Sequence, residues 1–198
     1  MIHFGKIVFF SMLVILAGCA TGPDVSSVEK KKAAKVKGPK VDPKIIVAYE
    51  RALISLRAGK DEQAESALRQ LVEQYPEFSG PRANLGILYF RINELEKAKS
   101  EFHSALEINA DNVVSLNHLG IISRGEGKFK EAVVYYEKAL QIDPDYAYAH
   151  LNFGILLELY MGKLPEALTH YKRYQALTKK EDIEVKKWIV DLARRAKK

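Results

Sequence analysis

Apolar residues recur from residue 45 onward with the spacing of amphipathic helices. One series of small residues, Ala64, Ala98, Ala132 and Ala167, advances by 34, 34 and 35 positions. Each of these alanines is followed at the fourth position by a large apolar residue and at the seventh by another apolar residue. Spacings of four and seven place the three side chains on one stripe of a helix. The pattern predicts a helix that returns about every 34 residues.

A second series indicates another helix in each period. Gly86, Gly120 and Gly154 are also 34 residues apart, and each is preceded by an apolar residue. Between the two series lies a Gly or Asn at positions 59, 93, 127 and 162, and these residue types tolerate the left-handed conformation that ends a helix. Pro76 and Pro144 mark the ends of units. Helix–turn–helix units of this period stack into a solenoid.

These positions resemble the tetratricopeptide repeat. The small residue at position eight of that family's 34 matches the three glycines, with Ala52 in the first unit. The family's aromatic at position twenty-four matches Phe102, Tyr136 and Tyr171, whereas the first unit has Leu68 there. The resemblance implies an all-α fold, a right-handed superhelical solenoid of antiparallel helix pairs. We expect four units, at 45–78, 79–112, 113–146 and 147–181.

Two features lie at the C-terminal end of this array. The fourth unit has one extra residue between Gly154 and Gly162, which we place in its first helix, as a π-bulge or an added turn residue around Leu156–Met161. Residues 182–198 then follow helical spacing and are expected to form a helix that caps the apolar end of the stack. Its apolar positions are Val185, Trp188, Ile189, Leu192 and Ala193.

The N-terminus reads as an export signal. Lys6 precedes an apolar run from Ile7 to Leu16, too short to span a bilayer, and small residues follow. Residues 16–19 (LAGC) resemble a bacterial lipobox, which implies a signal peptide over 1–18 and acylation of Cys19, with palmitate among the acyl chains. The alternative is that Cys19 is only a buried apolar residue of the signal. Ala20 after the cysteine points to the periplasmic side of an outer membrane.

Residues 19–44 are predicted to form a lysine-rich flexible tether. The stretch 20–44 has seven Lys against three Asp and Glu and no apolar periodicity. It is either a solvated spacer or a segment attracted to anionic lipids or to peptidoglycan carboxylates. Of the net charge of +6, residues 45–185 carry −4 and the last thirteen residues +5. A mildly acidic body between basic ends does not favour nucleic-acid binding.

The sequence shows no catalytic or metal-binding motif. The five histidines form no HExxH or other ligand pattern, and the chain lacks a phosphate-binding glycine loop and a GxSxG motif. The single cysteine is assigned to the lipid anchor. The sequence therefore predicts no catalytic residue, no metal, no cofactor and no enzymatic activity.

The first helices carry a second stripe, which in tetratricopeptide proteins lines a concave groove for partner peptides or helices. The alternative is that these side chains pack against neighbouring first helices. Tyr49, Phe90 and Tyr148 are the expected anchors because aromatics dominate binding hot spots. Some tetratricopeptide proteins bind the C-terminal carboxylate of a peptide with basic residues at set groove positions. This chain has no basic residues at those positions. The predicted groove comprises Tyr49, Leu53, Leu56, Asn84, Ile87, Phe90, Asn117, Ile121, Arg124, Tyr148, Leu151, Asn152 and Ile155.

These features predict an outer-membrane lipoprotein with a periplasmic solenoid that binds protein partners. The layout of lipobox plus repeats resembles the pilot lipoproteins of type IV pilus biogenesis, which help to localise or assemble secretins. Adaptors of cell-wall hydrolases and of envelope energy-coupling or motility complexes share the same layout. An envelope enzyme with an unrecognised site is the alternative of a different class.

Overall fold

The computed structural model describes residues 42–196, and within that range it contains nine α-helices and no strand. The helices are similar in length, with 13 to 15 residues each. The helices are α3 Pro43–Arg57, α4 Asp61–Gln74, α5 Ser79–Arg91, α6 Leu95–Ile108, α7 Val113–Gly125, α8 Phe129–Ile142, α9 Ala147–Leu159, α10 Leu164–Leu177 and α11 Ile183–Arg195.

The chain divides into two compact units, Met1–Val47 and Ala48–Lys198. In the first unit only residues 42–47 are described, and they contain the start of α3. The expected signal peptide, Cys19 and residues 20–41 of the tether lie outside the described residues. Among residues 42–196, no helix has the length and apolar character needed to cross a membrane.

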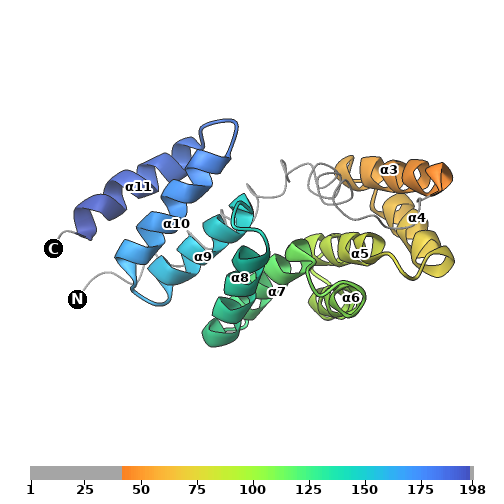
Figure 1. Ribbon diagram of the computed structural model, residues 1–198, viewed down its shortest axis with the longest axis horizontal. Helices are drawn as coiled ribbons and strands as arrows, with labels where there is room; N and C mark the ends of the chain where they lie inside the picture. The colour runs from red at the N-terminus through yellow and green to blue at the C-terminus, as the bar shows by residue number, and fades with distance from the viewer. Residues whose placement is uncertain (1–41, 197–198) are drawn as a thin grey trace. The chain divides into compact units, whose positions relative to one another are not determined.

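The unit Ala48–Lys198 is a linear stack of helix pairs (Figure 1). The pairs are α5 with α6, α7 with α8 and α9 with α10, and each pair also contacts the next. In addition, α5 contacts α7 and α7 contacts α9, so the first helices of successive pairs lie side by side. The predicted all-α stack of helix pairs is confirmed.

Each of the three inner pairs is held by a contact between a glycine and an aromatic ring. A Cβ atom added at Gly86 or Gly120 would lie 2.6 Å from a ring carbon of the aromatic residue opposite, and at Gly154 the distance would be 2.7 Å. Atoms do not approach that closely, so any larger residue at these positions would displace a buried ring. The Gly–aromatic contacts are Gly86–Phe102, Gly120–Tyr136 and Gly154–Tyr171.

The first pair departs from this rule at both positions at once. Ala52 and Leu68 stand where the later pairs have a glycine and an aromatic ring, and both are fully buried. A leucine side chain is smaller than a ring, and we infer that it leaves the space that the alanine methyl group occupies. We infer that the alanine and the leucine compensate each other, since both side chains are fully buried.

The turns within the pairs adopt the left-handed conformation. The backbone φ angles are 69° at Gly59, 62° at Asn93, 76° at Gly127 and 66° at Gly162. Asn93 is the single non-glycine residue with positive φ in the described part of the chain. Such a residue closes a helix and reverses the chain within a few residues.

The extra residue of the fourth pair lies in its turn. Helix α9 runs as a continuous α-helix and has 13 residues, as α5 and α7 do. In the third turn the Lys128 N–H donates to Ser123 O, five residues back, at 2.8 Å. In the fourth, the Lys163 N–H donates to Leu157 O, six residues back, at 2.9 Å. Placing the insertion in the helix as a π-bulge was wrong, and the alternative of an added turn residue is correct.

Helix α11 covers the last pair. Its N-cap Asp182 accepts hydrogen bonds from the backbone N–H groups of Glu184 and Val185, both at 3.1 Å. Val185 and Leu192 are buried, and the Trp188 ring lies 5.7 Å from the ring of Tyr171. The helix thus closes the apolar end of α10.

Candidate functional site

The predicted groove residues lie on the first helices α3, α5, α7 and α9, and we call this set the groove face. Five of them are buried: Leu53, Leu56, Asn84, Asn117 and Ile155. The other eight are half-buried, and none is fully exposed. The contacts of α7 with α5 and α9 account for much of this burial. The half-buried residues are Tyr49, Ile87, Phe90, Ile121, Arg124, Tyr148, Leu151 and Asn152.

Side-chain amides link neighbouring repeats across the groove face. The Asn84 amide donates to the Tyr49 hydroxyl at 2.5 Å and to Gly80 O at 2.9 Å. The Asn152 amide donates to the Asn117 side-chain carbonyl at 3.1 Å. Buried amides require such partners, because an unpaired polar group in the interior is unfavourable. Asn84, Asn117 and Asn152 therefore connect neighbouring repeats in addition to lying on the groove face.

Comparison with known proteins identifies the repeats. Family profiles described as "Tetratricopeptide repeat" match residues 47–77 and 82–112, and one described as "TPR repeat" matches residues 124–159. The chain contains tetratricopeptide repeats. Proteins with TPR units generally bind other proteins and generally are not enzymes.

Solved structures share the TPR fold at low sequence identity. Pseudomonas aeruginosa pilF superposes with a TM-score of 0.68 at 23% identity, over 77% of this chain and 69% of that one. MamA gives a TM-score of 0.56 at 21% identity, over 74% of this chain and 83% of its own. A Thermobaculum terrenum O-GlcNAc transferase gives 0.60 at 22% identity, over 66% of this chain and 26% of that protein. At these identities the comparisons establish the fold alone.

The three expected aromatic anchors differ in their surroundings. Tyr49 accepts the Asn84 hydrogen bond, so its hydroxyl is engaged within the TPR stack. Phe90 packs edge-on against the His118 ring at 5.8 Å between centroids. Tyr148 lies 6.2 Å from the ring of Tyr174. Phe90 is the one of the three whose side chain has no polar atom.

His118 forms part of the wall behind Phe90. Its Nδ1 lies 2.8 Å from Val114 O, and because a carbonyl only accepts, Nδ1 carries the proton. The ring stacks on Phe102 at 5.0 Å. Burial lowers the pKa of His118, so the ring is neutral at pH 7. A neutral, packed histidine supports the apolar character of the groove face.

Two arginines of the first helices, Arg91 and Arg124, donate hydrogen bonds to backbone carbonyls of neighbouring repeats. Arg91 donates to Leu56 O at 2.6 Å and also pairs with Asp61, which ties the second TPR unit to the first. Arg124 donates to the backbone carbonyl of Asn152 at 3.3 Å. Its guanidinium is half-buried and has further N–H groups, so the groove face presents a donor beside Ile121.

The sequence did not reveal a pair of histidines between α9 and α10. His150 Nδ1 and His170 Nδ1 are 2.9 Å apart, and His150 Nε2 donates to Pro144 O at 3.0 Å. Burial and the neighbouring His150 lower the pKa of His170 to about 4, and burial lowers the pKa of His150. The spacing of 20 residues matches no ligand motif, and only the helix pairing brings the rings together. His170, Phe153 and Leu140 line a shallow depression there.

Proposed function

We propose that this chain is a protein-binding scaffold of the bacterial cell envelope, attached through an acylated Cys19 to the periplasmic side of the outer membrane. The lipobox-like LAGC stretch at residues 16–19 and the lysine-rich stretch after it support the anchor and its tether. TPR repeats support the scaffold, and the half-buried groove face is where a partner would bind.

The observation that carries the binding site is the composition of the half-buried part of the groove face. Ile87, Phe90, Ile121 and Leu151 offer apolar contact from three successive first helices, and Arg124 adds a hydrogen-bond donor. An amphipathic helix or an extended peptide with apolar anchors matches such a surface. The groove face lacks the cations that would bind a peptide's C-terminal carboxylate. We therefore expect the groove to recognise side chains of the ligand and not its C-terminus.

The envelope machine that we favour is one that assembles a pilus or a secretin. The layout of leader, tether and TPR units resembles pilot lipoproteins of type IV pilus biogenesis, and the fold similarity to pilF is consistent with that assignment. Adaptors of cell-wall hydrolases and of energy-coupling or motility complexes are the second candidate. We propose no catalytic role. Release of fragments from peptidoglycan by the purified protein would contradict this.

Site-specific photo-crosslinking tests the groove. A benzophenone amino acid placed at Ile121, on the groove face, is expected to capture a defined envelope protein in living cells. The matched control is Val134, an exposed aliphatic residue on the second helix α8, with 60% of its surface accessible. A partner captured equally from Val134, or from Val134 alone, would move the binding site to the other face.

The anchor requires its own test. Cells grown with labelled palmitate should incorporate the label into the wild-type protein and not into a Cys19→Ala variant. The variant should also leave the membrane fraction. An unchanged membrane fraction with no label in either protein would show that the protein is held by other means.

A further inference from the structure

In the described part of the chain, the outer face of α11 exposes large aliphatic side chains that no other element covers. The helix packs on α10 through Val185, Leu192 and Trp188, so its opposite face has no partner element in the described structure. Two large aliphatic side chains lie on that opposite face, Ile183 with 62% of its surface exposed and Val190 with 56%. A helix whose only task is to cap a stack would carry polar residues there.

Cations surround the two aliphatic side chains. At about 100° per residue, Lys186, Lys187 and Arg194 lie within about 60° of Ile183 on the helix. The acidic residues of the helix, Glu184 and Asp191, lie about 80–100° away. The outer stripe therefore combines cations with exposed aliphatics and contains no carboxylate. It consists of Ile183, Lys186, Lys187, Val190 and Arg194.

Within residues 42–196, the cations of the outer stripe form exposed ion pairs. Lys186 pairs with Glu181 and Lys187 with Glu184, both at 2.7 Å, and Arg194 pairs with Asp191 at 3.3 Å; all six side chains are more than half exposed. Ion pairs at such positions contribute little to stability, so these lysines can exchange partners at small cost. An anionic surface that approaches the helix would compete for them directly.

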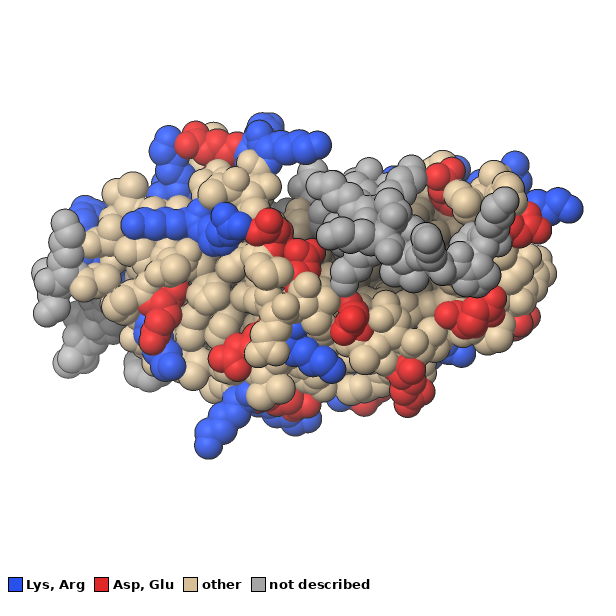
Figure 2. Space-filling model, viewed as in Figure 1, with Lys and Arg blue, Asp and Glu red and all other residues tan. Residues whose placement is uncertain are grey.

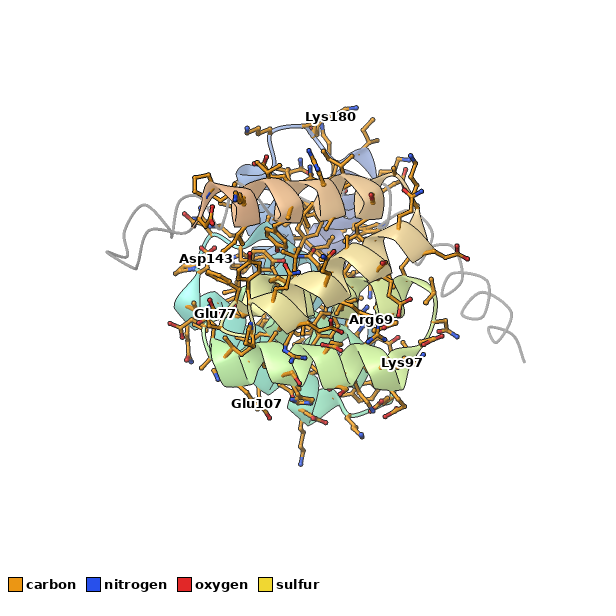
Figure 3. All side chains as sticks on the ribbon, turned by 90° about the vertical axis from the view of Figure 1, so that its right-hand side faces the viewer. Arg69, Glu77, Lys97, Glu107, Asp143 and Lys180 are labelled. Carbon is orange, nitrogen blue, oxygen red and sulfur yellow. The ribbon has the colours of Figure 1, made fainter. Side chains whose placement is uncertain are left out.

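The turn before α11 extends the basic surface. Lys179 and Lys180 are exposed, and Lys180 stands clear of the ribbon (Figure 3). Basic side chains gather around the turn between α10 and α11 (Figure 2). Residues 179–196 carry six Lys and Arg against four Asp and Glu, whereas residues 45–178 carry fifteen against eighteen. A negative surface would therefore attract this end and repel the repeats.

We propose that the outer stripe of α11 docks on the surface of an anionic phospholipid bilayer. Lysines bind headgroup phosphates, and aliphatic side chains among them insert between headgroups, which is the combination found in interfacial helices. An acidic protein would match the cations but gives no reason for the exposed Ile183 and Val190. The proposal rests on the proposed envelope location, and docking would set the orientation of the groove relative to the membrane.

The chain contains its own probe for this contact. Trp188 on α11 is the single tryptophan of the sequence. The full-length lipoprotein is reconstituted into vesicles with a dansyl-labelled headgroup, either of phosphatidylcholine or of an equal mixture with phosphatidylglycerol. Energy transfer from Trp188 is expected to be stronger in the anionic vesicles and to fall with added salt, because salt screens the attraction.

Two double variants separate the outer stripe from charge in general. One Lys near an anionic surface contributes about 1 kcal/mol, or roughly a fivefold change, so Lys186→Gln/Lys187→Gln should lower the ratio of docked to undocked protein about 25-fold. The matched control removes two exposed lysines of α8, Lys130→Gln/Lys138→Gln, and should leave the energy transfer unchanged. Ile183→Ser/Val190→Ser should weaken docking with no change in charge.

The outcomes are distinct. Equal energy transfer in the two kinds of vesicle, with the protein floating with both, overturns docking and leaves the anchor intact. Protein that does not float with phosphatidylcholine vesicles contradicts the anchor instead. Equal losses in the α8 control overturn the assignment to α11. Soluble polyglutamate that binds the stripe in the absence of any response to anionic vesicles would replace the bilayer with an acidic polymer.

Discussion

The glycines of the Gly–aromatic contacts and the groove face lie on the same first helices, yet different physical rules govern them. At Gly120, a single added methyl group would collide with the Tyr136 ring, so sterics permit one residue type. On the groove face, Ile87, Phe90 and Ile121 are half-buried and keep part of their surface in solvent. The Gly–aromatic contacts restrict the residue type, whereas the half-buried part of the groove face leaves the residue type less restricted.

The difference shows where an interaction protein can vary its sequence. Within the stack, the first unit has the buried Ala52 and Leu68 where later pairs have a glycine and a ring, and we infer that the two residues compensate each other. On the groove face, the half-buried side chains keep part of their surface in solvent, so substitutions there need not fill occupied space.

Gly120→Ala should destabilise the protein by about 2–3 kcal/mol, because the new Cβ would lie 2.6 Å from a Tyr136 ring carbon in a closely packed interior. Urea unfolding followed by circular dichroism measures the loss. Adding Tyr136→Leu recreates the Ala–Leu arrangement of the first pair and should recover part of it. A double variant less stable than the sum of the two single losses would contradict the compensation.

The matched control for that experiment is Gly125→Ala at the end of the same helix α7. Nothing lies within 4 Å of the position that its Cβ would take, and its φ is not positive. Removing the flexibility of glycine should leave stability unchanged or raise it by up to about 1 kcal/mol. An equal loss of stability at Gly120 and Gly125 would show that helix propensity, and not the ring contact, causes the effect.

The His150–His170 pair should make the protein acid-sensitive. Both pKa values are lowered by burial, that of His170 to about 4, whereas an unfolded histidine titrates near 6.5. As the pH falls from 6.5 towards 4.5, the unfolded chain binds protons that the folded protein does not, so stability decreases. We expect a loss of about 1–2 kcal/mol, reduced because His170 is partly exposed. Thermal unfolding at pH 7.5 and 4.5 measures it.

A His170→Gln variant gives the control for the acid effect. It removes one of the titrating rings, so its stability should depend less steeply on pH between 6.5 and 4.5 than that of the wild type. The comparison stays above pH 4.5 because the pKa values of Glu65 and Glu126 are lowered by hydrogen bonds, and their contribution is lost in more acidic solution. Identical slopes would assign the acid sensitivity to other groups.

Asn152→Ala on the groove face should have a smaller effect, a loss of about 1 kcal/mol. It removes the amide that donates to Asn117 at 3.1 Å, and Asn117 is buried with 2% exposure, so its carbonyl loses a partner. Chemical denaturation measures the change. A loss as large as that of Gly120→Ala would place the groove face among the parts that hold the stack together.

Tyr136→Phe should have the smallest effect, and in the opposite direction. In the described part of the chain the Tyr136 hydroxyl is buried and has no hydrogen-bond partner, and burial raises the pKa of that hydroxyl. The equivalent ring of the preceding pair is already a phenylalanine, Phe102. Removing the oxygen should stabilise the protein by up to about 1 kcal/mol, measured as a higher midpoint of urea unfolding.

The fold was predictable because its rules are local. A 34-residue period, glycines opposite aromatic rings and Gly or Asn at the turns each depend on residues close in sequence, and together they predicted the helix pairs. The location of the extra residue was predicted only in part. The count from Gly154 to Gly162 does not distinguish a longer helix from a longer turn, because either moves Gly162 by one position.

The groove face was harder to predict because its polar contacts join different repeats. The residue type alone predicts Tyr49 as an anchor. It does not reveal the hydrogen bond that the Tyr49 hydroxyl accepts from Asn84, 35 positions away. The His150–His170 contact likewise depends on how α9 packs on α10. Arg69 and Lys97, from α4 and α6, both lie over the ring of Tyr89, at 5.9 and 5.4 Å from its centroid, and residue spacing alone does not show this.

Within residues 48–196, each helix contacts only helices one or two places along the chain, so the described stack would carry mechanical load in series. A pull applied at its N-terminal end would pass through every described interface in turn. Such a stack yields one pair at a time, beginning with the weakest interface, and lengthens in steps. Strain applied to this stack would then be taken up one pair at a time, without loss of the whole fold at once.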